Sequence, residues 1–149
     1  MHIIEFFESD RQPDLIDSID KSDWRAAKYL ASLLRTQTFD TALGAAGRLY
    51  MLMDGDALVS FVTLTRKDCI DDDSLFPWLG FFYTFPAYRG HRHGGKLLSH
   101  AAQEARRMGY ACVYLATDHI GLYEKYGYHY VKDIVNYGGG TDRLYVKEM

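Results

Sequence analysis

The sequence predicts one α/β domain over residues 1–149, built on a mixed β-sheet. Two observations lead to this fold class. The turn signal Asp54-Gly55 separates two apolar segments, which predicts an antiparallel hairpin. Further along, the apolar run Trp78–Phe85 precedes a long helical pattern over Gly94–Met108, and no linker or internal repeat divides the chain. A hydrophobic content of 48% is enough to form one core.

The first third of the chain is predicted to be mainly helical. Ile3–Phe7 reads as a short strand, and Asp14–Ile19 as one or two helical turns. A clearer helix follows from Ser22, a residue type suited to an N-cap. Its apolar residues recur at helical spacing: Trp24, Ala27, Leu30, Ala31 and Leu34. Small residues around Phe39–Gly47 predict a loop.

The middle of the chain carries the predicted sheet core. Arg48–Met53 and Ala57–Thr65 are the two strands of the hairpin. Lys67–Ser74 contains three consecutive aspartates and is predicted to be an exposed connection. The run Trp78–Phe85 ends at Pro86 and predicts a central strand covered on both faces.

The last third alternates helix and strand. The apolar face of the helix comprises Leu97, Leu98, Ala101, Ala102, Ala105 and Met108. This helix stops at Gly109, in the position that glycine favours after a helix. The elements expected after it are a strand at Ala111–Ala116, a short helix at His119–Tyr126 capped by Thr117 or Asp118 and closed by Gly127, and strands at Tyr128–Val135 and Arg143–Lys147.

Composition excludes several classes of protein. A net charge of −3 argues against a general nucleic-acid binder. The cysteines Cys69 and Cys112 form no Cys-x-x-Cys pair, so a reduced, cytoplasmic setting is expected. Residues 1–5 lack the features of a signal peptide, and no apolar run approaches the ~20 residues that span a bilayer. We therefore expect a soluble protein without a membrane partner.

The segment Arg89–Lys96 has the chemistry of an anion site. It joins a predicted strand to a helix N-terminus, where free N–H groups and the helix dipole attract phosphate. Gly90–Lys96 also satisfies the nucleotide-binding pattern G-x-x-x-x-G-K, but Leu97 replaces the Ser or Thr that holds magnesium. A turn without a ligand is the remaining alternative. His91-x-His93 offers only two metal ligands without a carboxylate or cysteine nearby, so no metal is expected.

This segment resembles motif A of the GNAT family of acyl-CoA-dependent N-acyltransferases. Arg89, His91, His93 and Gly94 fit its spacing, Pro86-x-x-Arg89-Gly90 is the usual lead-in, and Arg92 replaces the first motif glycine. The resemblance implies that acetyl-CoA is the co-substrate and that its pyrophosphate is held by Arg89, Gly90, His91, Arg92, His93, Gly94, Gly95 and Lys96. It also implies backbone contacts to the pantetheine arm and the thioester from Phe82, Tyr83 and Thr84.

A second segment, Gly121–Tyr128, is similar to the family's short helix and following turn. The similarity implies that Tyr123 is the general acid that protonates the CoA thiolate. Tyr126 and Tyr128 are expected in the core. The implied fold is a mostly antiparallel sheet of about six or seven strands with about four helices, in which strands four and five splay apart to admit the cofactor arm.

The implied reaction is direct attack by a primary amine of a small molecule or peptide on the acetyl thioester. His119, the Asp71–Asp73 cluster and bulk water are the alternatives for removing the amine's proton. The aspartates either attract a cationic acceptor or form a solvated turn. Transfer of another acyl group, an alcohol acceptor, a non-catalytic acyl-CoA-binding regulator and a homodimer stay open.

Overall fold

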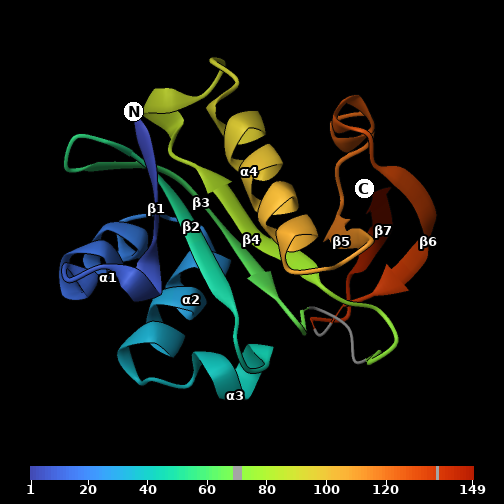
Figure 1. Ribbon diagram of the computed structural model, residues 1–149, viewed down its shortest axis with the longest axis horizontal. Helices are drawn as coiled ribbons and strands as arrows, with labels where there is room; N and C mark the ends of the chain where they lie inside the picture. The colour runs from blue at the N-terminus through green and yellow to red at the C-terminus, as the bar shows by residue number, and fades with distance from the viewer. Residues whose placement is uncertain (69–71, 137) are drawn as a thin grey trace.

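A computed structural model describes residues 1–68, 72–136 and 138–149. Within these ranges, seven strands form one sheet in the order β1-β2-β3-β4-β5-β7-β6 (Figure 1). All neighbouring strands are antiparallel except the parallel pair β4 and β5, which confirms a mixed, mostly antiparallel sheet. The strands are β1 His2–Glu5, β2 Arg48–Asp54, β3 Ala57–Thr65, β4 Trp78–Thr84, β5 Cys112–Thr117, β6 His129–Val135 and β7 Thr141–Glu148.

The described chain has four α-helices, in agreement with the number that the family resemblance implies, and three short 3₁₀ turns. They are α1 Gln12–Asp20, α2 Arg25–Arg35, α3 Phe39–Leu43 and α4 His93–Arg107, with η1 Phe6–Glu8, η2 Pro86–Tyr88 and η3 Tyr123–Tyr126. No helix in the described part of the chain is long and apolar enough to cross a membrane.

Two predictions for the N-terminal helices are wrong. The loop expected at Phe39–Gly47 contains α3, because Phe39 and Leu43 are buried and fix this single turn against the core. The second helix begins at Arg25 rather than directly after Ser22. The Ser22 hydroxyl accepts a hydrogen bond from the Trp24 N–H and forms a turn before the helix.

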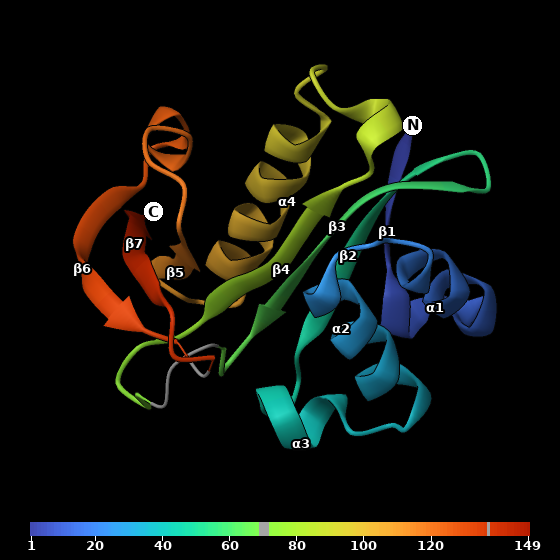
Figure 2. The same ribbon diagram turned by 180° about the vertical axis from the view of Figure 1, so that it is seen from behind.

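The helices cover the two faces of strands β1 to β4. Helices α1, α2 and α3 lie on one face and α4 on the other (Figures 1 and 2). Successive residues of β2 alternate between these layers: Met51 packs with the first group of helices, and Tyr50 and Leu52 pack with α4. Strands β5, β7 and β6 form a separate group on the other side of α4 (Figure 1).

Strands β4 and β5 separate almost as soon as they meet. Their register contains the single pair Trp78 and Tyr114, and Phe81 interrupts β4 with a left-handed φ of 50°. The sequence prediction of a strand covered on both faces is therefore correct only for Trp78 and Leu79. From Gly80 onward β4 is partly exposed, because no strand lies along this edge. The predicted splay of strands four and five is confirmed.

Two expectations near the C-terminal half also need correction. Met108 follows α4 and is 44% exposed, so it does not belong to the buried helix face. The short helix spans only Tyr123–Tyr126, because Gly121 adopts a left-handed φ of 89° that a helix cannot include. Consequently Thr117 does not cap it; the Thr117 hydroxyl accepts a hydrogen bond from the His119 N–H instead.

Candidate active site

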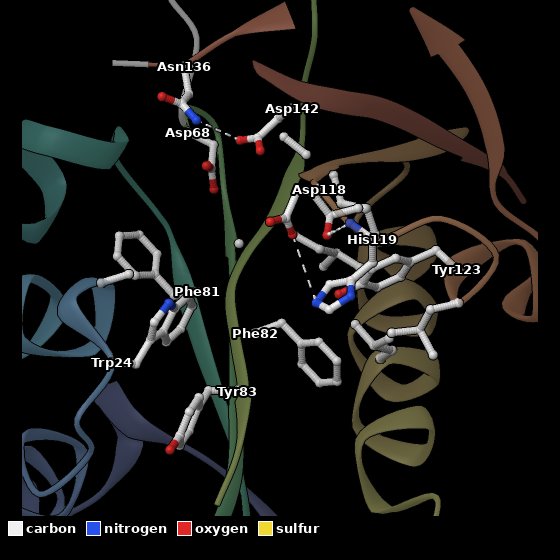
Figure 3. A pocket seen from close by; sticks show the side chains of 18 of the residues that line it. Trp24, Asp68, Phe81, Phe82, Tyr83, Asp118, His119, Tyr123, Asn136 and Asp142 are labelled. Carbon is white, nitrogen blue, oxygen red and sulfur yellow. Dashed lines mark hydrogen bonds and ion pairs between the residues drawn. The ribbon is translucent and has the colours of Figure 1, made fainter. Parts of the chain in front are cut away.

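A cavity of ≈ 1000 Å³ opens where β4 and β5 separate (Figure 3). Its wall is formed by β4, by the end of β5 and by η3. Residues of α2 and α3, and Asn136, Gly138 and Asp142 near the C-terminus, complete it. Five residues predicted for the site line it together: Phe82, Tyr83, Thr84, Arg89 and Tyr123. Residues far apart in the sequence thus meet around the gap in the sheet.

The other predicted residues gather at the start of α4. Arg92, Gly95 and Lys96 line a second groove of ≈ 570 Å³. Gly90, His91, His93 and Gly94 line neither space. The rings of His91 and His93 lie 5.7 Å apart, and the described residues include no group of three His, Cys, Asp or Glu side chains that could hold a metal.

Arg92 adopts the backbone conformation that a glycine would favour. It precedes α4 with φ 62° and ψ 20°, in the left-handed region, and its side chain makes no cap hydrogen bond. This conformation explains why glycine would suit the position. The first N–H groups of α4 lack intrahelical acceptors, so the turn presents donors beside the Arg92 and Lys96 cations.

The two glycines of the first helical turn allow close packing, a role that the sequence analysis missed. A Cβ atom on Gly94 would lie 2.6 Å from the Phe82 ring and 3.1 Å from the Thr84 hydroxyl. A Cβ atom on Gly95 would lie 2.8 Å from the Tyr126 ring. The N-terminus of α4 therefore rests directly against β4 and η3, at the edge of the cavity.

Arg89 folds back over the end of β4. Its Nε donates a 2.9 Å hydrogen bond to the Thr84 carbonyl, and its guanidinium lies 5.3 Å from the centre of the Tyr83 ring. These contacts hold a positive charge in the cavity wall, at the end nearest the start of α4.

Tyr123 is largely buried within a group of aromatic rings. The centres of the Phe82, Tyr128 and Tyr145 rings lie 6.0–6.4 Å from its own. Burial raises the pKa of Tyr123 to about 12, and a hydrogen bond with Thr117 acts in the opposite direction. The phenol is therefore protonated at neutral pH, as a general acid must be.

Hydrogen bonds support the segment that carries Tyr123. The Tyr145 hydroxyl accepts a hydrogen bond from Arg143 Nε at 3.0 Å and lies 3.3 Å from both the His119 carbonyl and the Glu124 carboxylate. The same carboxylate accepts from the Gly121 N–H. Strand β7 thus fixes the position of η3.

One end of the cavity is acidic. Asp68, Asp118 and Asp142 line it from three different segments, and Asn136 Nδ2 donates a 3.0 Å hydrogen bond to Asp142 (Figure 3). Of the residues predicted as bases, His119 also lines the cavity, whereas Asp72 and Asp73 do not and Asp71 lies outside the described residues. The sequence analysis did not identify Asp68, Asn136 or Asp142.

Aromatic side chains line the cavity where β4 faces α2. Trp24, directly before α2, stacks on Tyr83 (Figure 3). Tyr29, within α2, contacts Phe81. The helical spacing of the sequence identified Trp24 only as a helix residue. These rings give the cavity an apolar wall suited to the carbon skeleton of a ligand.

A splayed sheet with a cationic helix N-terminus at its gap is suited to an extended anionic ligand. Residues 8–128 match the model of the acetyltransferase (GNAT) family. The chain therefore belongs to this family and is an acyltransferase. A comparison with curated protein sequences finds no match.

Solved structures share the fold at low sequence identity. The aminoglycoside 6'-N-acetyltransferase from Enterococcus faecium has a TM-score of 0.74 and 18% identity, with 99% of this chain and 97% of that chain covered. An aminoglycoside 6'-N-acetyltransferase complexed with coenzyme A has a TM-score of 0.72 and 17% identity, with the same coverage of both chains. An acyl-CoA N-acyltransferase from Pseudomonas aeruginosa has a TM-score of 0.68 and 16% identity, with 98% of this chain and 97% of that chain covered.

Proposed function

We propose that this chain transfers the acetyl group of acetyl-CoA to a primary amine of a cationic small molecule. The observation that carries the proposal is the single cavity that joins Tyr123, the open edge of β4 and an acidic end. Membership of the acetyltransferase family supports an acyl donor in the gap between the strands, and the carboxylates favour a cationic acceptor.

The residues present fit the anionic part of acetyl-CoA. Arg89, Arg92 and Lys96 surround the start of α4, where free N–H groups point outward. Gly94 permits the helix to approach β4 at this point. We assign the pyrophosphate to Arg89–Lys96 and the pantetheine arm to the backbone of Phe82, Tyr83 and Thr84.

In the proposed reaction the neutral amine nitrogen bonds to the acetyl carbon, and the C=O electron pair moves onto oxygen. The C=O bond then re-forms as the C–S bond breaks, and the sulfur takes the Tyr123 hydroxyl proton, which solvent replaces. The nitrogen loses one proton, which balances the proton gained by sulfur. Burial keeps Tyr123 protonated until negative charge develops on the sulfur.

A small-molecule acceptor is favoured over a peptide by the shape of the acidic end. Asp68, Asp118 and Asp142 come from three segments around one cavity, together with an aromatic wall. Two solved structures with the same fold are aminoglycoside acetyltransferases, and aminoglycosides carry several amino groups. A cytoplasmic location and a homodimer stay predictions.

Two measurements test the proposal in order. Thermal unfolding with acetyl-CoA at 100 times its dissociation constant should show about 2.7 kcal/mol of added stability. Thiol release is then measured with aminoglycosides, polyamines, simple alkyl amines and lysine peptides, and we expect the polycationic small molecules to give the highest kcat/KM. Absence of a thermal shift at millimolar acetyl-CoA refutes the cofactor assignment, and faster turnover of peptides refutes the acceptor class.

A further inference from the structure

The β4 strand lacks a side chain at the point where it leaves β5. Gly80 lies two residues after Trp78, the last residue paired with β5, and directly before the irregular residue Phe81. Its φ is not in the left-handed region, so the backbone there accepts any residue. Glycine at this position is therefore required for space rather than for conformation.

The space at Gly80 is filled by the carboxylate of Asp68. A Cβ atom on Gly80 would collide with Asp68 Oδ2, which comes from the segment after β3. Both residues line the cavity. An acidic group thus stands beside the central strand, although β4 itself has no acidic residue.

The surroundings of this carboxylate are polar and largely shielded from water. Thr63 pairs with Gly80 across β3 and β4, is 0% exposed, and has its hydroxyl 3.2 Å from the same Cβ position. Within the described ranges the Thr63 hydroxyl has no hydrogen-bond partner. A polar ligand group at Gly80 would therefore meet a carboxylate and a hydroxyl together.

We propose that Asp68 binds the amino group of the acceptor beside Gly80 and takes up its proton as the C–N bond forms. This inference rests on the proposed function and assigns the base that the sequence left open. As the amine nitrogen bonds to the acetyl carbon, its N–H bond breaks, its proton moves to the Asp68 carboxylate and then to solvent. The sulfur separately receives its proton from Tyr123.

The other acids and bases of the cavity are less suited to this role. Asp118 and His119 are exposed, with 82% and 65% of their side chains accessible, and lie 4.0 Å apart. Asp142 belongs to β7, which does not pair with β4. Asp68 is half-buried and lies beside the irregular part of β4. Water therefore competes less for hydrogen bonds to its carboxylate than at the exposed Asp118 and His119.

Asp68→Asn tests the proposal because it keeps the size of the side chain and removes the base. We expect kcat/KM for the amine to fall ~10²–10³-fold while the thermal shift with acetyl-CoA is retained. The loss should be larger at about pH 6.5 than at about pH 9, since hydroxide can take the proton from the nitrogen in place of Asp68 at high pH. A purely structural role would give a loss that does not depend on pH.

Gly80→Ala supplies an independent test, because the added methyl group displaces the Asp68 carboxylate. We expect a similar loss, and the double variant should lose little more than Asp68→Asn alone. Asp54→Asn is the control: this exposed hairpin residue does not line the cavity, and the charge change is the same. Its kcat/KM should match that of the unmodified protein.

The outcomes separate this inference from the proposed function. If the unmodified protein turns over and the Asp68→Asn variant is equally active, only the role of Asp68 is overturned. A pH-independent loss, or a loss of the acetyl-CoA shift in Asp68→Asn, also overturns it. Lack of both acetyl-CoA binding and turnover in the unmodified protein overturns the proposed function itself.

Discussion

The indole ring of Trp24 lies nearly parallel to the phenol ring of Tyr83, with centroids 5.5 Å apart and an angle of 11° between the planes. Trp24 directly precedes α2, and Tyr83 lies in β4 (Figure 3). The stack therefore joins the start of a helix on one face of the sheet to the strand that forms the cavity wall. It holds an aromatic surface in the cavity wall, and we expect this surface to contact the acceptor.

Removal of this surface should weaken acceptor binding. For Trp24→Ala we predict a KM for the amine that rises roughly 3- to 10-fold, because an aromatic pair contributes about 0.5–1.5 kcal/mol. The acetyl-CoA thermal shift should stay unchanged. Steady-state kinetics with each substrate varied in turn measure this, and Met108→Ala, at an exposed site outside the cavity, is the control. A rise in the KM for acetyl-CoA instead would place Trp24 at the donor.

Loss of the Tyr123 hydroxyl should slow turnover and spare binding. For Tyr123→Phe we predict a kcat lower by ~10²–10⁴-fold with a retained acetyl-CoA thermal shift, since the proton donation that we propose occurs when the C–S bond breaks. Tyr128→Phe is a matched control, because this buried neighbour does not line the cavity. Full activity of the Tyr123 variant would exclude the proposed acid.

Arg92 combines a strained backbone with a useful charge, and two substitutions separate them. Arg92→Gly and Arg92→Ala both remove the guanidinium, so both should weaken acetyl-CoA binding several-fold. Only glycine relieves the left-handed conformation, so Arg92→Gly should be about 1 kcal/mol more stable than Arg92→Ala. Urea unfolding and calorimetric titration measure the two effects. Equal stabilities would mean that the turn rearranges in the alanine variant.

Tyr128 should make the protein sensitive to alkali. Burial raises the pKa of Tyr128 above its ordinary value of about 10, so the native state keeps a proton that the unfolded chain loses. This contribution to stability is complete below about pH 10 and disappears as the pH rises through the native pKa. The free energy of unfolding of Tyr128→Phe should therefore fall less between about pH 9 and 11 than that of the unmodified protein.

The same variant should be no less stable at neutral pH. Within the part of the chain that the structure describes, the Tyr128 hydroxyl has no hydrogen-bond partner, so its removal relieves a buried polar group by about 1 kcal/mol. Urea midpoints at neutral pH and at about pH 9 and 11 check both statements. A midpoint at neutral pH well below that of the unmodified protein would reveal a hydrogen bond on this hydroxyl.

The regular elements were predictable where the hydrophobic pattern is long. The Asp54-Gly55 turn located β2 and β3, and the repeat of Leu and Ala located α4. Short elements escaped this reasoning: α3 has five residues, fewer than two periods of a helix. The start of η3 depends on the left-handed Gly121, whose conformation no pattern of side chains reveals.

The same distinction applies to the candidate site: residues in contiguous motifs could be predicted, and residues from separate segments could not. Arg89 and Tyr123 belong to contiguous motifs, so the sequence identified them, and the structure places both in one cavity. Asp68, Asn136 and Asp142 follow or belong to three different strands, and no local signal joins them. They come together because β7 lies beside β5 in the sheet order, which depends on packing across the whole molecule.

An ordinary open sheet has two edges, but the early separation of β4 and β5 gives this sheet two more, which face each other across the cavity. The backbone N–H and C=O groups of an edge need water or a ligand as partners. A hydrocarbon chain in the gap would leave them unbonded, at about 1–3 kcal/mol each, whereas an arm with amide groups can replace the lost water. The backbone of the sheet thereby selects for a peptide-like ligand before any side chain takes part.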